Sequence, residues 1–589
     1  MSTEEGSPVE DAGSPGGIAA GRGTPARGNA LRRWGPFTAI LLALALFVGL
    51  VARGGGESVA VDDTLPESGL MADPANVELP NGVLPFEVAE ARGEVGDIDW
   101  GPRCDVETGR LRLPLSPPPS CFAPFEGDNG GATSTGVTAE TIKVVVYTPQ
   151  LNDPLLSFIY AQIGNDDTPQ KVFDTYVGFN EIMARYYETY GRRVELIKYE
   201  ATGSSADAVA AAADAETIAR DIQPFAVLGG PNLTGAFAET LAANQVLCIS
   251  CAPGQTAEWF EERGPYVWDI GKNIDQNIQM TAEYVTKRLA GGNAVYGGPE
   301  VVDQPRVFGR VFLEGLNASQ EPSERFRALL GEGGVEFAEE ASYADPVSLG
   351  GTAREIMARF KAAGVTTILF AGDPLAPQAL TQAATEQDYF PEWVITGSAL
   401  TDTTIFGRTY DQAQWEHAFG PSNLFARVSP TVAGSGYLYR WYFDGAEPPA
   451  QQSALILPSL QLLYGVLQGA GTDLSPEMFR QVIFASEIIP GSVIAPQISW
   501  GERGIWPGVD YAGLDDQTEV WWDPSATGED EIGNDGAGMW TYADGGRRYL
   551  PGGWPDSPPA LFGDDVNPVA LYEQLPEGIT LPQYEPLPR

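Results

Sequence analysis

The run IKVVVY at residues 142–147 begins the part of the sequence that decides the fold. It is a continuous β-branched run, which is typical of a strand buried on both faces of a parallel sheet. Helical stretches and short apolar runs then alternate, and this βαβα order predicts a parallel, doubly wound α/β sheet. The predicted helices are 171–190, 207–221 and one that begins near Thr234, and the predicted strands are 194–199, 225–228 and 245–249.

A second α/β series follows Asp269 and predicts a second lobe with a sheet of its own. Two further helical stretches, 452–469 and 476–484, precede a segment rich in Trp, Gly and Asp at 500–556 and a Pro-rich tail. In the second series, the predicted helices are 275–290, 322–330, 353–363 and 377–387, and the predicted strands are 293–296, 335–338, 366–370 and 393–396.

An apolar run, WGPFTAILLALALFVGLVA, extends from Trp34 to Ala52 without a charged residue. About 19 helical residues cover a hydrocarbon core of about 30 Å. Four arginines lie at 22–33 and only Arg53 follows closely, which predicts a cytoplasmic N-terminus and an extracytoplasmic chain after Gly54. A cleaved signal peptide is the alternative. Because Leu50 and Ala52 form a poor cleavage site and no cysteine follows the run to carry a lipid, we expect a retained single-pass anchor.

The charge of the chain excludes two classes of partner. The 79 acidic residues outnumber the 35 basic ones, giving a net charge of −44. Such a surface repels nucleic acid and anionic lipid, so we expect contact with a membrane only through the N-terminal helix.

Four cysteines in an exported chain suggest disulfides. Three pairings are possible, and we favour the two local ones, Cys104–Cys121 and Cys248–Cys251. The second pairing requires a turn, because extended residues three apart lie too far from each other. The spacing of Cys104 and Cys121 does not suit a four-thiolate zinc site.

The sequence offers little catalytic chemistry. Its single histidine, His417, lies beside Trp415 and Phe419 and is interpreted as a packing residue. There is no GxSxG, Walker A or HExxH motif. The acidic segment 528–536 places Ile532 where a calcium loop needs an oxygen ligand, so we interpret it as a solvated loop. We therefore expect no enzyme, no metal and no cofactor.

The turn LGGPNLTGAF at 228–237 is the strongest candidate for a binding element. It leaves a buried strand and opens a helix, so free backbone N–H groups and the helix dipole favour an anionic or accepting group there. Asn232 and Thr234 add side-chain donors. Ordinary helix capping is the alternative interpretation.

Three stretches in this order, IKVVVYTP, AVLGGPNLTGAFAETLAANQVLCISCAP and GVTTILFAGDPLAPQALTQA, resemble type I periplasmic binding proteins, in particular the leucine/isoleucine/valine-binding substrate-binding proteins of ABC transporters. The resemblance covers about 141–520. It implies two lobes joined by three crossovers, which we expect near Gly271, Ser398 and Ile489.

The resulting domain prediction has six parts. It assigns a disordered cytoplasmic tail to 1–33, the anchor to 34–52, a stalk to 54–140, the first lobe to 141–270 with about 398–488, the second lobe to 271–397 with about 489–520, and a C-terminal extension to 521–589.

The resemblance also implies a set of ligand-binding positions. Thr234 matches the helix-start hydroxyl that holds the ligand's carboxylate in the family, and Phe308 would close an aromatic ring over the ligand. Gly397 and Ser398 stand where the family has the acid that pairs with an amino acid's ammonium, so Asp373 or Asp402 is the remaining candidate for that role. The implied ligand-binding residues are Gly230, Asn232, Thr234, Ala252, Gln255, Phe308, Asp373 and Ser398.

The function expected from this resemblance is an extracytoplasmic solute-binding protein that delivers a small polar or amino-acid-like solute to an ABC permease. The alternative is a ligand-binding sensor domain of the same fold that acts through a partner protein.

Overall fold

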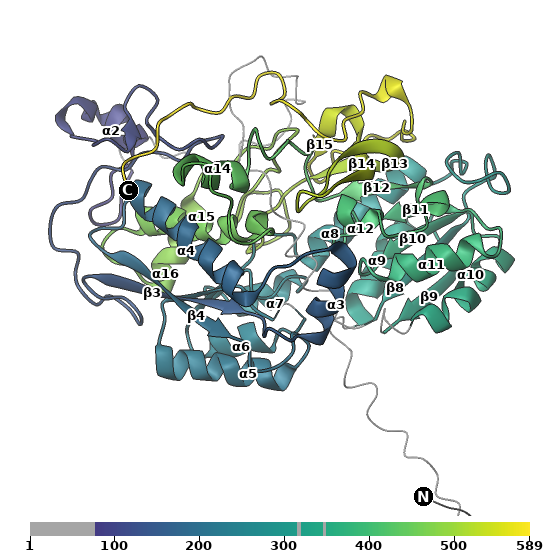
Figure 1. Cartoon of the computed structure of the whole chain (residues 1–589), viewed down its shortest axis with the longest axis horizontal. Helices are drawn as coiled ribbons and strands as arrows, with labels where there is room; N and C mark the ends of the chain where they lie inside the picture. Colours follow the sequence, from purple (N-terminus) through teal and green to yellow (C-terminus); the bar gives the residue numbers. More distant parts are fainter. Residues whose placement is uncertain (1–76, 232, 315–319, 345–348) are drawn as a thin grey trace, which may run out of the picture.

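The computed structural model describes residues 77–231, 233–314, 320–344 and 349–589. The predicted tail at 1–33 and the predicted anchor at 34–52 lie outside the described residues. The described chain forms two α/β lobes that lie side by side (Figure 1).

Lobe 1 is built on a five-stranded, wholly parallel sheet in the order β4-β3-β5-β6-β7. The run 142–147 falls in β3, which lies between β4 and β5, and this interior position explains why it is apolar on both faces. The strands are β3 (Thr141–Thr148), β4 (Arg193–Glu200), β5 (Ala226–Leu228), β6 (Leu247–Ile249) and β7 (Val267–Trp268).

Helices cover both sides of this sheet, with α4 and α15 on one side and α5 and α6 on the other (Figure 1). Among the described helices, α15 is long and apolar enough to span a membrane, but most of its side chains are buried in lobe 1, as in the core helix of a folded domain. The helices are α3 (Pro154–Ile163), α4 (Pro169–Tyr186), α5 (Ala208–Thr217, continued as a π-helix over Ile218–Ile222), α6 (Ala236–Ala243), α7 (Ala257–Glu262), α14 (Ser435–Tyr442), α15 (Ser453–Ala470) and α16 (Pro476–Ala485).

Lobe 2 is built on an eight-stranded mixed sheet, in which β9-β8-β10-β11-β12 are parallel and β13 to β15 are added antiparallel. The strands are β8 (Phe308–Leu313), β9 (Phe337–Tyr343), β10 (Thr367–Ala371), β11 (Glu392–Ile395), β12 (Ala418–Ser422), β13 (Gln517–Glu529), β14 (Asp535–Tyr542) and β15 (Arg548–Tyr549). The helices are α8 (Ile274–Tyr284, continued as a π-helix over Val285–Leu289), α9 (Gln320–Glu332), α10 (Ala353–Ala362), α11 (Ala376–Thr385), α12 (Thr404–Gly407) and α13 (Gln412–Trp415), with short 3-10 turns at Leu349–Gly351, Ala543–Gly546 and Asp564–Val566.

Three crossovers join the lobes, as expected, but the second one lies later than Ser398. It follows β12 and covers 423–434, because β12 pairs with β11 and keeps the chain in lobe 2. The first crossover is 269–273 and the third is 486–516. Residues 398–422 and the strands of the predicted C-terminal extension therefore belong to lobe 2 rather than to lobe 1 or to a separate part.

One predicted strand is wrong and several strands were not predicted. Residues 293–296 make only an isolated bridge between Asn293 and Pro305, and the sheet position is taken by β8. Strand β12 was not predicted because it contains Gly420 and Pro421, which are unusual in strands. Gly420 is nevertheless required there, because a Cβ would lie 2.4 Å from the Ile395 carbonyl oxygen. The β13–β14 hairpin was not predicted either, because β13 contains Pro524 and an irregularity in its pairing with β14.

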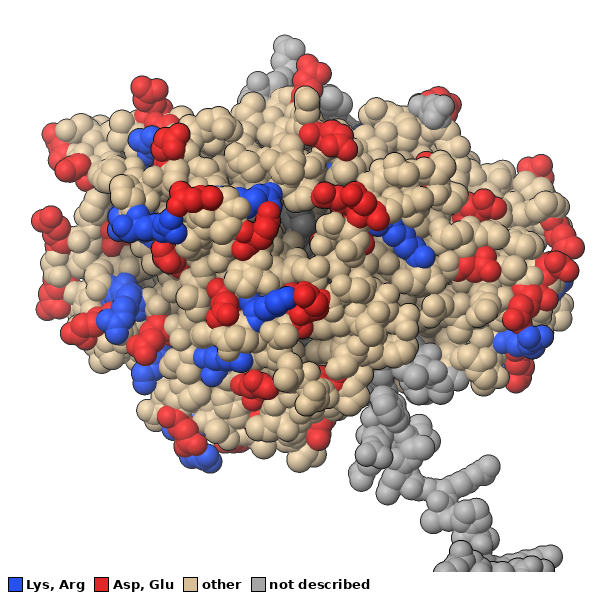
Figure 2. Space-filling model, in the orientation of Figure 1, with Lys and Arg blue, Asp and Glu red and all other residues tan. Residues whose placement is uncertain are grey.

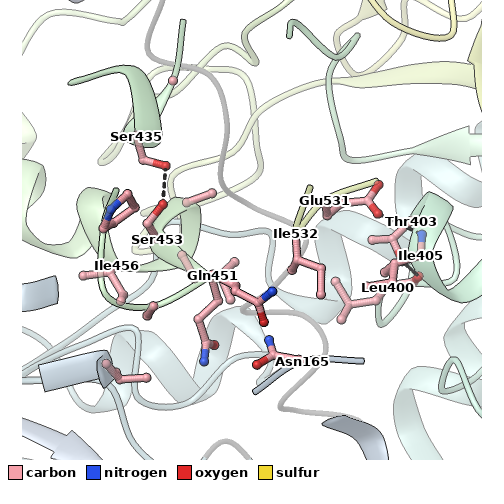
Figure 3. A pocket seen from close by; sticks show the side chains of 18 of the residues that line it. Asn165, Leu400, Thr403, Ile405, Ser435, Gln451, Ser453, Ile456, Glu531 and Ile532 are labelled. Atoms are coloured by element: carbon pink, nitrogen blue, oxygen red, sulfur yellow. Dashed lines mark hydrogen bonds between the residues drawn. The ribbon is translucent and has the colours of Figure 1, made fainter. Parts of the chain in front are cut away.

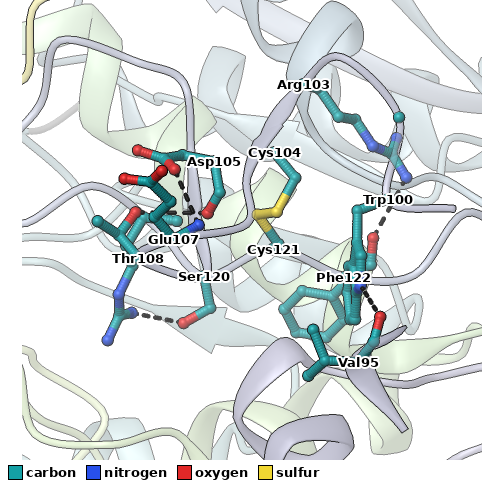
Figure 4. Close-up of a disulfide and its surroundings, with 12 residues drawn as sticks. Val95, Trp100, Arg103, Cys104, Asp105, Glu107, Thr108, Ser120, Cys121 and Phe122 are labelled. Carbon is teal, nitrogen blue, oxygen red and sulfur yellow. Dashed lines mark hydrogen bonds between the residues drawn. A yellow bond between two sulfur atoms is a disulfide. The ribbon is translucent and has the colours of Figure 1, made fainter. Parts of the chain in front are cut away.

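The described part of the predicted stalk packs on lobe 1. It contains α2 (Phe86–Arg92), a 3-10 turn at Val95–Asp97, and the strand pair β1 (Cys104–Asp105) and β2 (Arg110–Leu111). The Cys104–Cys121 disulfide closes this loop (Figure 4). Arg103 Nη2 reaches Glu188 Oε2 of lobe 1 at 2.5 Å. This segment is therefore part of the folded body.

The C-terminal segment connects the two lobes a further time. Val569 pairs with Tyr542 at the sheet of lobe 2, and Tyr572 N donates to the Arg427 carbonyl of the second crossover at 2.7 Å. The chain then crosses to lobe 1, where Tyr584 OH donates to Asp105 Oδ2 at 2.7 Å and Trp441 Nε1 donates to the Tyr584 carbonyl at 2.6 Å. Figure 1 shows this path in yellow.

Candidate functional site

A cavity of about 850 Å³ lies between the lobes. Its lobe 1 wall includes the loops at the carboxyl ends of β3 to β7, represented by Pro149, Ala201, Gly229, Ser250 and Asp269. Ligands of open parallel sheets bind at this edge. We call this space the interlobe cavity.

The remaining walls come from helices and from lobe 2. In Figure 3, Asn165, Gln451, Ser453 and Ile456 on the lobe 1 side face residues of lobe 2. The labelled residues of lobe 2 are Leu400, Thr403, Ile405, Glu531 and Ile532.

Helix α3 closes one side of the cavity. Leu156 and Ile159 line the cavity and, with Leu155, belong to the apolar cluster of lobe 2. Asp153 fixes the start of α3, since its Oδ1 accepts the N–H groups of Leu155 and Leu156 at 2.9 and 3.0 Å. A helix of lobe 1 thus packs against lobe 2.

Gly230 is the predicted binding residue that lines the interlobe cavity. Its lack of a side chain is required, because a Cβ would lie 2.9 Å from the Cys251 carbonyl oxygen. The Cys248–Cys251 disulfide closes the predicted turn, with Ser250 at a φ of 57°. Both predicted disulfides are confirmed. Asn232 lies outside the described residues.

Four predicted residues have structural contacts and do not line the cavity. Thr234 Oγ1 accepts the Ala236 N–H at 3.2 Å in the turn before α6, whose N-cap residue is Gly235 and which has no side-chain cap. Ala252 is buried in the core of lobe 1. The Gln255 carbonyl accepts the Ile274 N–H at 3.0 Å, and Ser398 Oγ donates to the Gly372 carbonyl at 3.3 Å. That these residues contact a solute stays a prediction.

Phe308 and Asp373 differ most from expectation. Phe308 opens β8 at the end of the strand away from the cavity and packs in an apolar core of lobe 2, so it does not form a lid. Asp373 is fully buried, and burial raises the pKa of its carboxyl. Its Oδ1 caps α11 by accepting the Leu375 and Ala376 N–H groups, and its Oδ2 accepts from Tyr343 OH at 2.5 Å. These contacts occupy both oxygens.

Two cavity residues that the sequence did not indicate have unpartnered polar atoms. Nη1 of Arg427 is buried without an acceptor among the described residues, and Oδ2 of Asp269 is buried without a donor there. Burial raises the pKa of Asp269 to about 6. Both residues belong to crossovers, and no local motif marks either position, so only long-range packing identifies them.

A buried polar network joins the crossovers behind the cavity. Lys272 Nζ donates to the Asp516 carbonyl at 2.5 Å, and Arg548 pairs with the Asp516 carboxylate at 2.9 Å while also donating to the Asn423 carbonyl at 3.3 Å. Trp500 Nε1 donates to the Asp269 carbonyl at 3.0 Å. The three crossovers are therefore held at one hinge.

Neither His417 nor the acidic segment 528–536 forms a chemical centre. His417 Nδ1 donates to the Tyr296 carbonyl at 2.7 Å. The segment 528–536 joins β13 to β14, and Asp530 Oδ1 accepts the N–H groups of Ile532 and Asn534. Among the described residues, no group of three or more His, Cys, Asp or Glu side chains is placed to hold a metal.

The chain belongs to the periplasmic binding protein family, whose model matches residues 178–503, more than half of the sequence. No curated protein matches it. This agrees with the resemblance found in the sequence and with the two lobes, whose sheets are parallel in lobe 1 and mixed, with a parallel core, in lobe 2.

The solved structures to which this chain is similar include the following three. An ABC transporter protein of R. palustris in complex with 4-hydroxybenzoate is 14% identical, covering 68% of this chain and 97% of its own, with a TM-score of 0.46. A leucine-, isoleucine-, valine-, threonine- and alanine-binding protein of Brucella ovis is 13% identical, covering 71% and 98%, with a TM-score of 0.49. A fatty acid ABC transporter protein of Thermomonospora curvata is 14% identical, covering 70% and 94%, with a TM-score of 0.46.

Proposed function

We propose that this protein is an extracytoplasmic solute-binding protein that encloses one small molecule between its lobes and presents it to an ABC permease. The observation that carries the proposal is the interlobe cavity, which is lined by both lobes and by the hinge crossovers. A ligand that contacts both lobes favours the closed arrangement by its differential affinity for it. Membership of the periplasmic binding protein family supports an extracytoplasmic site of action. The proposed role is non-enzymatic.

The solute class differs from the small polar molecule expected from the sequence. The residues Thr234 and Asp373, on which that expectation depended, do not line the cavity. Aliphatic, aromatic and proline side chains make up just over half of the residues that line the cavity, and about a third of the lining residues are polar or charged. Such a lining favours a solute with an apolar body, because its removal from water supplies most of the affinity.

Ligand release and thermal unfolding test this function. The purified full chain is analysed by native mass spectrometry for bound small molecules, and its unfolding is followed with amino acids, aromatic acids, fatty acids, sugars and polyamines. We expect at least one class of compound to raise the melting temperature. The same compound should lower the radius of gyration measured by small-angle scattering, because the lobes close around it. If no class does either, the proposed function is wrong.

We further propose that residues 34–52 tether the protein to the membrane. The support is the uncharged run with arginines on its N-terminal side. N-terminal sequencing of membrane-extracted protein is expected to find the run intact. A mature N-terminus near Arg53 would contradict tethering and leave solute binding unaffected.

A further inference from the structure

Resting on the proposed function, we propose that the solute carries an anionic group, which Arg427 holds while an apolar body fills the interlobe cavity. Arg427 belongs to the second crossover, and this crossover with the following helix start, residues 427–436, forms part of the cavity lining. Within them, Arg427, Val428, Pro430, Thr431 and Ala433 to Gly436 line the cavity.

Arg427 supplies a full positive charge with unused donors. Its side chain is 13% exposed, and its Nη1 has no acceptor among the described residues. Its nearest carboxylate is Glu531, whose Oε1 lies 4.0 Å from Nε. Nη1 itself is closed to solvent, so a solute would contact the exposed part of this side chain, for which no hydrogen bond to a described residue is found. A charged donor at the cavity wall favours an acceptor on the solute.

The carboxylate of Glu531 is already engaged elsewhere. Its two oxygens accept the N–H groups of Thr404 and Ile405 at 2.9 and 2.8 Å, at the start of α12. Glu531 therefore neutralises part of the charge of Arg427 without satisfying its hydrogen bonds. A ligand carboxylate could make the close, charge-assisted bonds that Glu531 does not make.

The start of α14 is a second part of the cavity lining that favours an anion. Gly434 is the N-cap residue and its helix has no side-chain cap, and the N–H groups of Ser435 and Gly436 have no acceptor in the described part of the chain. Ser435 Oγ lies 3.0 Å from Ser453 Oγ, as Figure 3 shows. Because two hydroxyls share one hydrogen bond, one O–H remains free to donate to a ligand. Free N–H groups and the helix dipole favour an anion here.

The other charges of the cavity are mostly paired internally. Arg440 donates to Glu447 Oε2 at 2.7 Å, and Asp530 lies 3.5 Å from Arg408. Asp269 is the rival feature, since its unpartnered Oδ2 favours a donor or a cation on the solute. The test must therefore separate an anionic from a cationic ligand.

Three probes share one apolar body and differ in the end group: 4-phenylbutanoate, 4-phenylbutan-1-ol and 4-phenylbutylamine. Their dissociation constants are measured by calorimetry on the purified full chain at pH 7.5. We expect the carboxylate to bind about tenfold or more tighter than the alcohol, because a charged hydrogen bond contributes at least that much. Tighter binding of the amine, or equal binding of the alcohol and the carboxylate, would overturn the proposal.

Variants then locate the anion site. Arg427→Met should reduce the affinity for 4-phenylbutanoate to that of the alcohol, and Arg427→Lys should restore part of the preference. Arg480→Met is the matched control, since this arginine pairs with Glu477 and does not line the cavity, and it should keep the preference. An unchanged preference in a folded Arg427→Met protein would overturn the proposal. If no probe binds while another solute raises the melting temperature, the anion site is wrong and the proposed function stands. If nothing binds, both are wrong.

Discussion

Asp373 matches a binding position of the family, but both oxygens of its carboxylate make contacts within lobe 2 that stabilise the fold. Its carboxylate caps α11 and accepts from Tyr343, within the core of lobe 2. Asp373→Ala should lower the free energy of unfolding by about 1–3 kcal/mol, because a cap and a buried hydrogen bond are both lost. Urea unfolding measures this, with the exposed Glu336→Gln as control. Solute affinity should not change, and a large selective loss of affinity would return Asp373 to the binding site.

Asp402 makes stability depend on pH. It is fully buried, and burial raises its pKa from 3.8 to about 6. The folded state therefore holds a proton that the unfolded state has already released, so the stability contributed by this group is complete below about pH 4 and is lost as the pH rises through 6. Asp402→Asn mimics the neutral form. Relative to this variant, the wild type should lose about 2–3 kcal/mol of unfolding free energy between pH 4 and 6.5. A constant difference across this range would contradict the assignment.

At the scale of elements, the two disulfides should contribute unequally. The Cys104–Cys121 bond joins residues 17 apart, and Cys248–Cys251 joins residues 3 apart. On the chain-entropy model, replacing the first pair by serine should cost about 3 kcal/mol and replacing the second about 2 kcal/mol. Denaturant unfolding of the two double variants under identical conditions measures the difference. The reverse order would show that the turn around Ser250 and Gly230 depends on its bond for more than entropy.

The elements also show what the sequence could predict. Strands β3 to β6 were predicted because β-branched and apolar runs stand between clear helices. Strands β8 and β12 to β14 contain Gly, Pro or Arg, and their pairing partners decide their conformation. The residues that line the cavity were even harder to predict from the sequence. Gly230 was found from its turn, whereas Arg427 and the start of α14 reach the cavity only through the path of the second crossover, which no local pattern describes.

At the scale of the whole molecule, acidic side chains are distributed over the surface with basic ones among them, and the face in Figure 2 carries no large basic patch. The lobes meet at the hinge network, through α3 and through the C-terminal segment. Deleting residues 573–589 removes the contacts of Tyr584 and Leu587 with lobe 1. We expect the deletion to increase the radius of gyration without solute and to accelerate solute exchange in stopped-flow measurements. Tyr584→Phe, which loses only the bond to Asp105, should have a smaller effect. Equal exchange rates in all three proteins would show that this segment does not restrain the lobes.

Because the C-terminal segment crosses between the lobes from Tyr572 to Tyr584, it should affect the rate at which a solute is released. If two lobes are joined only at a hinge, the hinge alone determines the rate at which they open and close. A segment that contacts both lobes must detach or extend before the lobes separate. It therefore adds a free-energy barrier to lobe opening in both the solute-bound and the solute-free protein. Because the segment is also expected to favour the closed arrangement of the solute-free protein, both the affinity for the solute and its residence time should depend on the segment.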